Sequence, residues 1–377
     1  MTHRANRLTA APGSGGVLAA RAEDFWVDEV LPYTPIGQGQ HLFLRVTKAE
    51  ATTPQAVGRI AERLGVTPAD IGVAGLKDHR AVTRQWMSVP WPVQAPLPEL
   101  DTLPTEIRSG FEGGALRAAA AGPKVWITDA IRHRNKLKRG HVRANRFRIR
   151  IREVPAGGFE RAVAAAETLG RIGMPNRFGP QRYGRDGDNA GRARRILAGE
   201  ERPPRSRRAR ALLFSALQSE LFDRVLVERH RRGWWSTALM GDVMVRHDPP
   251  AMFDVTDPAA DQPRVERLEI SPSGPLFGKS TRPVRGEAAA LEGEVLAGSG
   301  LSDAEVARLG PGSRRALRLP VPEDLDISAS TPNELMLAFS LPAGAYATVL
   351  LEEICDLRAV RPTTSSDEAN DERSAFE

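Results

Sequence analysis

Asp78 is the side chain with the best setting for chemistry in this sequence. It lies in a polar turn that follows the apolar run 71–75, where a side chain is held rigidly and presented to a cleft. Lys77 and Arg80 flank it, and nearby cations favour the ionised carboxylate, which attacks electrophilic carbon or stabilises positive charge. The same residues also fit a turn aspartate whose only partners are backbone groups.

The histidines and the single cysteine form no metal-binding pattern. The seven histidines give no HxxxH or HExxH pair, and one cysteine cannot give CxxC. We therefore expect no metal site. Cys355 cannot form an internal disulfide and has no histidine pattern beside it, so we expect a buried core thiol.

The segment SGPLFGKS at 273–280 matches a phosphate-binding loop only in part. That loop needs glycine at the position of Ser273, whereas Gly274 is one residue too close to Gly278, and Pro275 removes a donor N–H. No GxGxxG or GxSxG stands between an expected strand and an expected helix. We therefore expect no nucleotide cofactor, no dinucleotide-binding fold and no serine hydrolase.

Positive charge is concentrated in two stretches of the chain. The formal net charge is +6, and it is +9 without the acidic segment 361–377 (51 basic against 42 acidic residues). Ten Lys/Arg and no acid lie between Arg132 and Arg152, and eight arginines against two glutamates lie between Arg192 and Arg210. Either stretch alone also fits a solvated face. The two together favour a polyanionic partner.

Alternation, helical periodicity and capping residues predict a mixture of strands and helices. Over 145–154, Phe147, Ile149 and Ile151 fall on one face and arginines on the other, so one face packs and the other meets phosphate or water. Strands are expected over 25–31, 41–47, 71–75, 84–89, 124–133, 145–154 and 335–341. Helices are expected over 54–64 with Thr53 as the cap, 158–171, 187–199, 208–231 and 342–354.

This order of elements predicts an α+β fold with a helical middle section. Strand patterns resume after the middle section, which suggests an insertion. No stretch reaches the roughly 18 apolar residues of a membrane span, and the first residues lack a signal-peptide core, so we expect a soluble, cytoplasmic protein. The acidic tail 361–377 is expected to be disordered.

Seven segments resemble the TruD family of tRNA pseudouridine synthases. AGLKDHRAVTRQW around Asp78 is similar to the family motif G-x-K-D-x-x-A-x-T-x-Q. The other matches follow the family order along the chain. They are EDFWVDE at 23–29, NRF at 145–147, MPNRFGPQRYG at 174–184, LFSALQSELFD at 213–223, SGPLFG at 273–278 and SLPAGAYATVLLEEI at 340–354.

The resemblance implies two domains. A pseudouridine synthase catalytic domain with a mixed sheet would comprise residues 1–172 and 329–360, and an inserted α/β TRUD domain would comprise 173–328. The RNA cleft would lie between them, with Gln181, Arg182 and Tyr183 at its entry. The family glycine/proline turn would fall at 273–278.

The resemblance also implies an activity, the isomerisation of uridine 13 in the D arm of tRNA to pseudouridine. The N1–C1′ bond breaks, the uracil turns while bound, and C5 joins C1′. Asp78 would be the nucleophile at C1′ or the group that begins a glycal-type elimination. The base must first be flipped into a pocket. Lys77, Asn145, Phe147 and Phe25 would support the site, with Phe147 stacked on the uracil.

Several cations would then hold the RNA backbone without reading its sequence. They are Arg132, Arg134, Lys136, Lys138, Arg139, Arg143, Arg146 and Arg148, with Arg150 and Arg152 on the same strand face. The resemblance implies a monomer that needs no cofactor. One departure is Ala19, where the family commonly has lysine. Arg21 is the nearby cation that would replace it.

Two other functions fit parts of the pattern. An RNA-binding protein without catalysis would keep the basic stretches, but it has no need of a carboxylate facing a polyanion. A carboxylate-dependent glycosidase would need a second acid about 5–9 Å from Asp78, and no acid partner is evident near it in the sequence.

Overall fold

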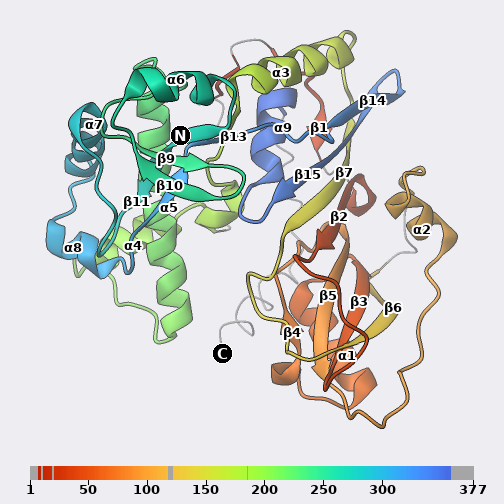
Figure 1. Cartoon of the computed structure of the whole chain (residues 1–377). Helices are drawn as coiled ribbons and strands as arrows, with labels where there is room; N and C mark the ends of the chain where they lie inside the picture. The colour runs from red at the N-terminus through yellow and green to blue at the C-terminus, as the bar shows by residue number, and fades with distance from the viewer. Residues whose placement is uncertain (1–6, 10–11, 19–20, 118–121, 185, 358–377) are drawn as a thin grey trace.

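The computed structural model describes residues 7–9, 12–18, 21–117, 122–184 and 186–357. The predicted tail 361–377 and Ala19 lie outside these residues. Helices and strands from both halves of the chain build an α+β structure (Figure 1), which confirms the predicted class. Within the described residues, no helix is long and apolar enough to cross a bilayer.

The main sheet has nine strands. Its order is β14-β15-β7-β2-β5-β3-β6, with β1 paired to β7 and β4 paired to β5. β2 and β5 run parallel and the other pairs are antiparallel, so the sheet is mixed. The strands are β1 (Val17–Leu18), β2 (Phe25–Val30), β3 (His41–Ala49), β4 (Gly72–Val73), β5 (Val82–Pro90), β6 (Lys124–His133), β7 (Ala144–Arg152), β14 (Asp326–Thr331) and β15 (Glu334–Pro342).

Three helices cover one face of this sheet. α1 (Thr53–Leu64) packs on β3 and β5, whereas α3 (Gly158–Ile172) and α9 (Ala347–Cys355) pack on β7 and β15. Thr83 pairs with Lys48 in β3 and with Val27 in β2, so both groups of helices share this face. α2 (Thr105–Phe111) lies on the opposite face, where Phe111 packs against Trp26.

The section between α3 and β14 has a sheet and a core of its own. The strand order of its sheet is β10-β9-β11-β12. Residues of α4 (Asn189–Leu197), α7 (Gly286–Ala297) and α8 (Asp303–Arg308) pack with α5 (Arg207–Arg231) in one core cluster. In Figure 1 the section fills the left of the view. The strands are β8 (Met174–Pro175), β9 (Val243–Arg246), β10 (Ala251–Asp254), β11 (Ile270–Leu276), β12 (Ser313–Ala316) and β13 (Arg318–Leu319). The helices are α4 (Asn189–Leu197), α5 (Arg207–Arg231), α6 (Pro258–Glu266), α7 (Gly286–Ala297) and α8 (Asp303–Arg308).

The two ends of the described chain are joined. The backbone N–H of Ser14 donates to the carbonyl of Ile354 at 3.2 Å, and that of Gly15 donates to Cys355 at 2.6 Å. The buried Glu353 carboxylate accepts the N–H of Leu8 at 2.9 Å. The N-terminal segment is therefore fixed to α9, late in the sequence.

Three local predictions were wrong. Thr52, not Thr53, caps α1, because Thr52 accepts the N–H of Gln55 and Gln55 bonds back in a capping box. The last helix begins at Ala347, not Pro342, since residue 342 ends β15 and a turn follows. The expected turn at 273–278 belongs to β11 as far as Leu276. By contrast, Cys355 is fully buried as predicted.

Candidate active site

A cavity of about 190 Å³ opens beside Asp78. It lies where the loop 74–81, strands β2 and β7, the short 3-10 helix η4 (Pro180–Tyr183) and the start of α9 meet. The segments come from five separate parts of the sequence. The lining residues are Phe25, Val27, Leu76, Lys77, Asp78, Asn145, Phe147, Gln181, Ala345, Tyr346, Ala347 and Thr348.

Asp78 is the only acid among the described residues that line this cavity. Its side chain remains open to solvent, although protein surrounds it and Gln181 Nε2 lies 3.4 Å from Oδ2. This protein surrounding raises the pKa of Asp78 above its ordinary value, and the charges of Lys48 and Lys77 oppose that rise. The single acid does not provide the carboxylate pair of a glycosidase.

The ammonium group of Lys77 is bound to a residue of strand β2. Its Nζ forms an ion pair with Glu29 Oε2 at 2.6 Å, and Glu29 is fully buried. The other oxygen, Oε1, accepts the backbone N–H of Trp86 at 3.1 Å. The backbone N–H of Lys77 donates to Thr53 Oγ1 at 2.9 Å. The pair therefore fixes the Asp78 loop to β2, β5 and α1.

Aromatic rings form one wall of the cavity. Phe25 and Phe147 meet edge to face with centroids 6.1 Å apart, and Phe147 stacks on Phe339 at 5.3 Å. Phe147 is only 8% exposed, so it is both a core residue and a cavity residue. Phe25 faces the cavity and Trp26 the opposite side of the sheet.

Two polar atoms beside this wall have no partner. Asn145 Oδ1 and Thr348 Oγ1 are buried, and neither forms a hydrogen bond within the part of the chain that the structure describes. A buried group without a partner costs about 1–3 kcal/mol, so both atoms are suited to a ligand that brings a donor or an acceptor. Sequence reasoning missed Thr348, whose setting depends on the approach of η4.

η4 approaches α9 closely because residue 179 is glycine. A Cβ there would lie 2.7 Å from the Tyr346 ring and 2.9 Å from Thr348 Oγ1. Of the three residues expected at the cleft entry, Gln181 lines the cavity. Arg182 donates to Ser219 Oγ at 3.0 Å, and the Tyr183 hydroxyl donates to Asp223 Oδ2 at 2.5 Å. Arg182 and Tyr183 therefore hold η4 on α5.

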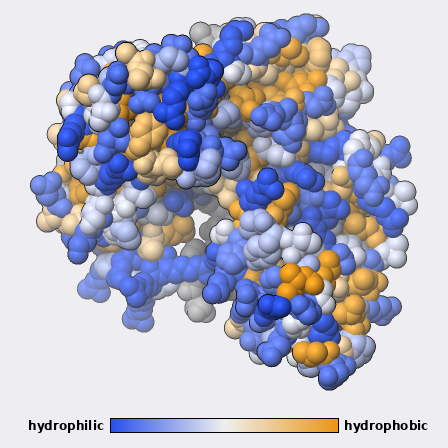
Figure 2. All heavy atoms as spheres, viewed as in Figure 1, coloured by the Kyte–Doolittle hydropathy of each residue, from blue (hydrophilic) through white to orange (hydrophobic). Residues whose placement is uncertain are grey.

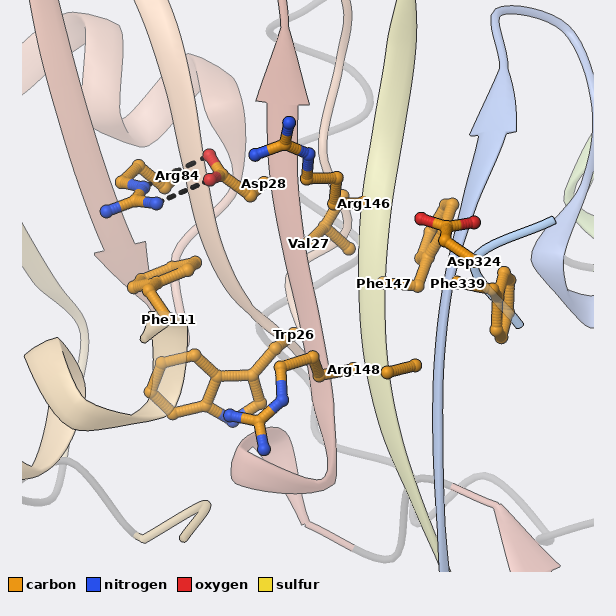
Figure 3. Close-up of a pocket in the computed structure, with 11 residues that line it drawn as sticks. Trp26, Val27, Asp28, Arg84, Phe111, Arg146, Phe147, Arg148, Asp324 and Phe339 are labelled. Carbon is orange, nitrogen blue, oxygen red and sulfur yellow. Dashed lines mark hydrogen bonds and ion pairs between the residues drawn. The ribbon is translucent and has the colours of Figure 1, made fainter. Parts of the chain in front are cut away.

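Two arginines on the other face of β7, Arg146 and Arg148, line a second cavity of about 210 Å³ (Figure 3). Arg148 donates to the carbonyl groups of Gly110, Gly113 and Gly114. In the same way, Arg150 donates to the backbone carbonyl of Leu116, and Arg152 forms ion pairs with the carboxylates of Asp24 and Glu334. Arg146 is exposed beside the Arg84–Asp28 pair, and no hydrogen bond or ion pair of its own is found within the described residues.

The remaining cations of this stretch lie at the end of β6 and in the loop 134–143. Arg132 donates to the backbone carbonyl groups of Pro92 and Ala95, and Lys136 donates to that of Ala69. The loop lies beside the Asp78 loop, because the Gly140 N–H donates to the Ala74 carbonyl at 2.9 Å. Its exposed cations are Arg134, Lys138, Arg139 and Arg143.

The two basic stretches of the sequence meet near Arg139. The protein around Arg139 lowers its pKa, and so does the positive charge of Arg208 in the first turn of α5. Both residues are exposed. The surface is hollowed between the two parts of the molecule, with mostly hydrophilic residues around the hollow (Figure 2). Arg21, by contrast, forms an ion pair with Glu23, with 3.7 Å between its guanidinium nitrogen and Oε1, and it does not line the cavity beside Asp78.

The sequence is similar to those of known proteins over most of its length. A family model described as tRNA pseudouridine synthase D (TruD) matches residues 3–200 and 206–354. The chain belongs to the TruD family. A relative from Anaeromyxobacter dehalogenans named tRNA pseudouridine synthase D is 44% identical over 93% of this chain and 96% of its own. A TruD relative from Thermus thermophilus is 39% identical over 93% and 91%.

A crystal structure supports the same fold. The structure described as putative tRNA pseudouridine synthase D (TruD) from Methanosarcina mazei superposes with a TM-score of 0.67. It covers 93% of this chain and 95% of its own, with 21% sequence identity. The TruD fold therefore extends over both the main sheet and the section between α3 and β14.

Proposed function

We propose that this protein isomerises uridine 13 in the D arm of tRNA to pseudouridine, with Asp78 as the nucleophile. The class of enzyme follows from membership of the TruD family, whose members are tRNA pseudouridine synthases. The observation that carries the proposed mechanism is the position of Asp78. It is a lone carboxylate at a cavity with an aromatic wall and two unpartnered polar atoms.

The reaction needs one nucleophile and no net change of atoms. Attack of the Asp78 carboxylate on C1′ breaks the N1–C1′ bond, and the electron pair leaves with the uracil. After the uracil turns, C5 attacks C1′ and releases the carboxylate. C5 then loses its proton and N1 gains one. Ionised Asp78 is the form required, and the cations Lys48 and Lys77 favour it.

The cavity offers a uracil both stacking and hydrogen bonds. Phe25 and Phe147 present aromatic surface, which is worth about 1–3 kcal/mol per stacked base. Asn145 Oδ1 is an acceptor for the uracil N3–H, and the Thr348 hydroxyl is a donor for a uracil carbonyl. The exposed cations Arg139 and Arg208, which lie close enough for the charge of one to act on the other, would hold the RNA backbone.

Pseudouridine mapping of unmodified tRNA tests the proposal. The purified protein is expected to convert position 13, and a tRNA with cytidine at position 13 is expected to remain unmodified. Modification at another position with uridine 13 untouched would refute the proposed site. Tight binding of tRNA with no conversion at all would favour an RNA-binding protein.

Thr348→Val is expected to lower activity without lowering stability. Valine keeps the shape but removes the hydroxyl, so a lost hydrogen bond of about 0.5–1.5 kcal/mol predicts a kcat/KM about 2- to 13-fold lower. In the free protein the hydroxyl has no partner within the described residues. The free energy of unfolding should therefore not fall. Steady-state kinetics and urea denaturation measure both effects, and unchanged kcat/KM would exclude contact between Thr348 and the base.

Arg139→Glu and Arg208→Glu are each expected to weaken tRNA binding. Each removed phosphate contact should reduce the slope of log K against log salt concentration by about 1. Arg171→Glu, on the exposed end of α3, is the control and should bind as the wild type does. Fluorescence anisotropy titrations between low and moderate salt give the slopes. Equal slopes for all four proteins would place the RNA elsewhere.

A further inference from the structure

Lys48 is a fully buried lysine near the end of β3. It pairs with Thr83 in the sheet and lies on the face that carries α1 and the Asp78 loop. An ammonium group removed from water is stable only when other groups replace the water. The partners of Lys48 therefore show what its charge is used for.

Both hydrogen-bond partners of Lys48 are backbone carbonyl groups. Its Nζ donates to the carbonyl of Asp78 at 2.8 Å and to that of Ala51 at 2.6 Å. Ala51 precedes Thr52, the cap of α1. Asp78 lies in the loop 74–81, which is not part of a strand or helix. One side chain thus joins β3, the start of α1 and the peptide of Asp78.

The use of lysine at this position is itself informative. The chain contains six lysines among 53 basic residues, and two of the six, Lys48 and Lys77, lie at the Asp78 loop. Lys124, Lys138 and Lys279 are exposed. A compact ammonium fits between two carbonyl oxygens, whereas a planar guanidinium spreads its donors in a fork. Arginine, which the chain uses elsewhere, does not suit this site.

The negative charge of the Asp78 carboxylate stabilises the buried positive charge of Lys48. Burial lowers the pKa of Lys48 to about 7, and the negative charge of Asp78 opposes the change. The other charged group that acts on both is Lys77, whose ammonium also forms an ion pair with Glu29 at 2.6 Å. Lys48 therefore holds the Asp78 backbone while its charge favours the ionised carboxylate.

We propose that Lys48 is a positioning residue for the reaction, because its ammonium group fixes the peptide of Asp78 and so sets where the carboxylate meets C1′ of the target nucleotide. This inference rests on the proposed role of Asp78. Lys48 does not touch the substrate, since it is fully buried and does not line the cavity.

Three variants separate the hydrogen bonds from the charge. Lys48→Met removes both, Lys48→Gln keeps two N–H donors without the charge, and exposed Lys124→Met is the control. Three measurements are made on each full-length protein. They are the single-turnover rate of pseudouridine formation against pH, the affinity for tRNA, and hydrogen exchange of the amides at 76–80.

Lys48→Met is expected to lower the single-turnover rate about 100-fold, because a misplacement of the reacting group by about 1 Å has an effect of that size. Hydrogen exchange of the amides at 76–80 should be faster, and the affinity for tRNA should be unchanged. Lys48→Gln is expected to shift the acid limb of the pH–rate profile upward by about one unit or more, because a neighbouring cation lowers a carboxyl pKa by about 1–3 units. Lys124→Met should match the wild type in all three measurements.

A Lys48→Met rate within threefold of wild type, with an unmoved acid limb in Lys48→Gln, would overturn the inference. If Lys48→Met does not fold, the acid limb of Lys48→Gln decides. A wild type that forms no pseudouridine in tRNA would instead defeat the proposed function. In that event, unchanged exchange at 76–80 in Lys48→Met would separately refute the positioning role.

Discussion

Asp78→Asn is expected to lower the single-turnover rate of pseudouridine formation by about 10⁴-fold or more, as loss of an essential nucleophile does in other enzymes. Asparagine keeps the size of the side chain but cannot attack C1′ as an anion. Binding of tRNA should remain within about twofold, because the change removes a negative charge from a site for a polyanion. Quenched single-turnover assays and anisotropy titrations measure the two effects.

The same variant is expected to be at least as stable as the wild type at neutral pH. The pKa of Asp78 is raised in the folded protein, so folding disfavours the ionised form relative to the unfolded chain. The protonated carboxyl group therefore adds to the free energy of unfolding. This contribution is complete at pH values below the pKa of Asp78 in the unfolded chain, and it is lost as the pH rises through the higher pKa of the folded protein. Asparagine mimics that neutral form. A variant that is both inactive and unstable would contradict a purely chemical role for Asp78.

Glu29→Gln is expected to lower the free energy of unfolding by about 3–5 kcal/mol, because it leaves the buried Lys77 ammonium without its anion. Urea denaturation measures the loss. Glu62→Gln, on the exposed side of α1, is the matched control and should change stability by less than about 0.5 kcal/mol.

The double variant Glu29→Gln, Lys77→Met tests the cause of this loss. Removing the stranded ammonium should restore part of the stability, since a buried ion pair replaced by uncharged groups costs less than a broken pair. A Glu29→Gln loss below about 1 kcal/mol would mean that water reaches Lys77. Failure of the double variant to recover any stability would assign the loss to the Trp86 hydrogen bond.

The sequence predicts most of what depends on local pattern. The alternation over β7 separates Phe147, Ile149 and Ile151 from the arginines, and the structure confirms that division. The same pattern does not reveal what the arginines meet. Arg148, Arg150 and Arg152 bond carbonyl and carboxylate groups of the chain, because segments distant in sequence fold over that face.

Phe25, Lys77, Asn145 and Phe147 were expected at the site and line the cavity, but several contacts that support it escape prediction for the same reason. The expected strand 41–47 stops one residue before Lys48, and nothing local shows that its ammonium meets the carbonyl of residue 78. Thr348 looks like any threonine in a helix until Gly179 brings η4 against it. Glu29 and Lys77 are 48 positions apart. These contacts follow from the path of the chain, which single-sequence patterns do not contain.

The joined ends of the chain have a consequence for synthesis on the ribosome. β15 completes the nine-stranded sheet, and α9 carries Thr348 with Tyr346 as its N-cap residue. Both elements follow the whole section between α3 and β14. Most residues of one core cluster come from that section, but Leu8 and Tyr346 from outside it also belong to the cluster. The earlier strands must wait for β15 with one edge of β7 unpaired. The cavity beside Asp78 is therefore complete only when residues 345–348 have been synthesised, and the N-terminal segment finds its partners only when Ile354 and Cys355 have followed.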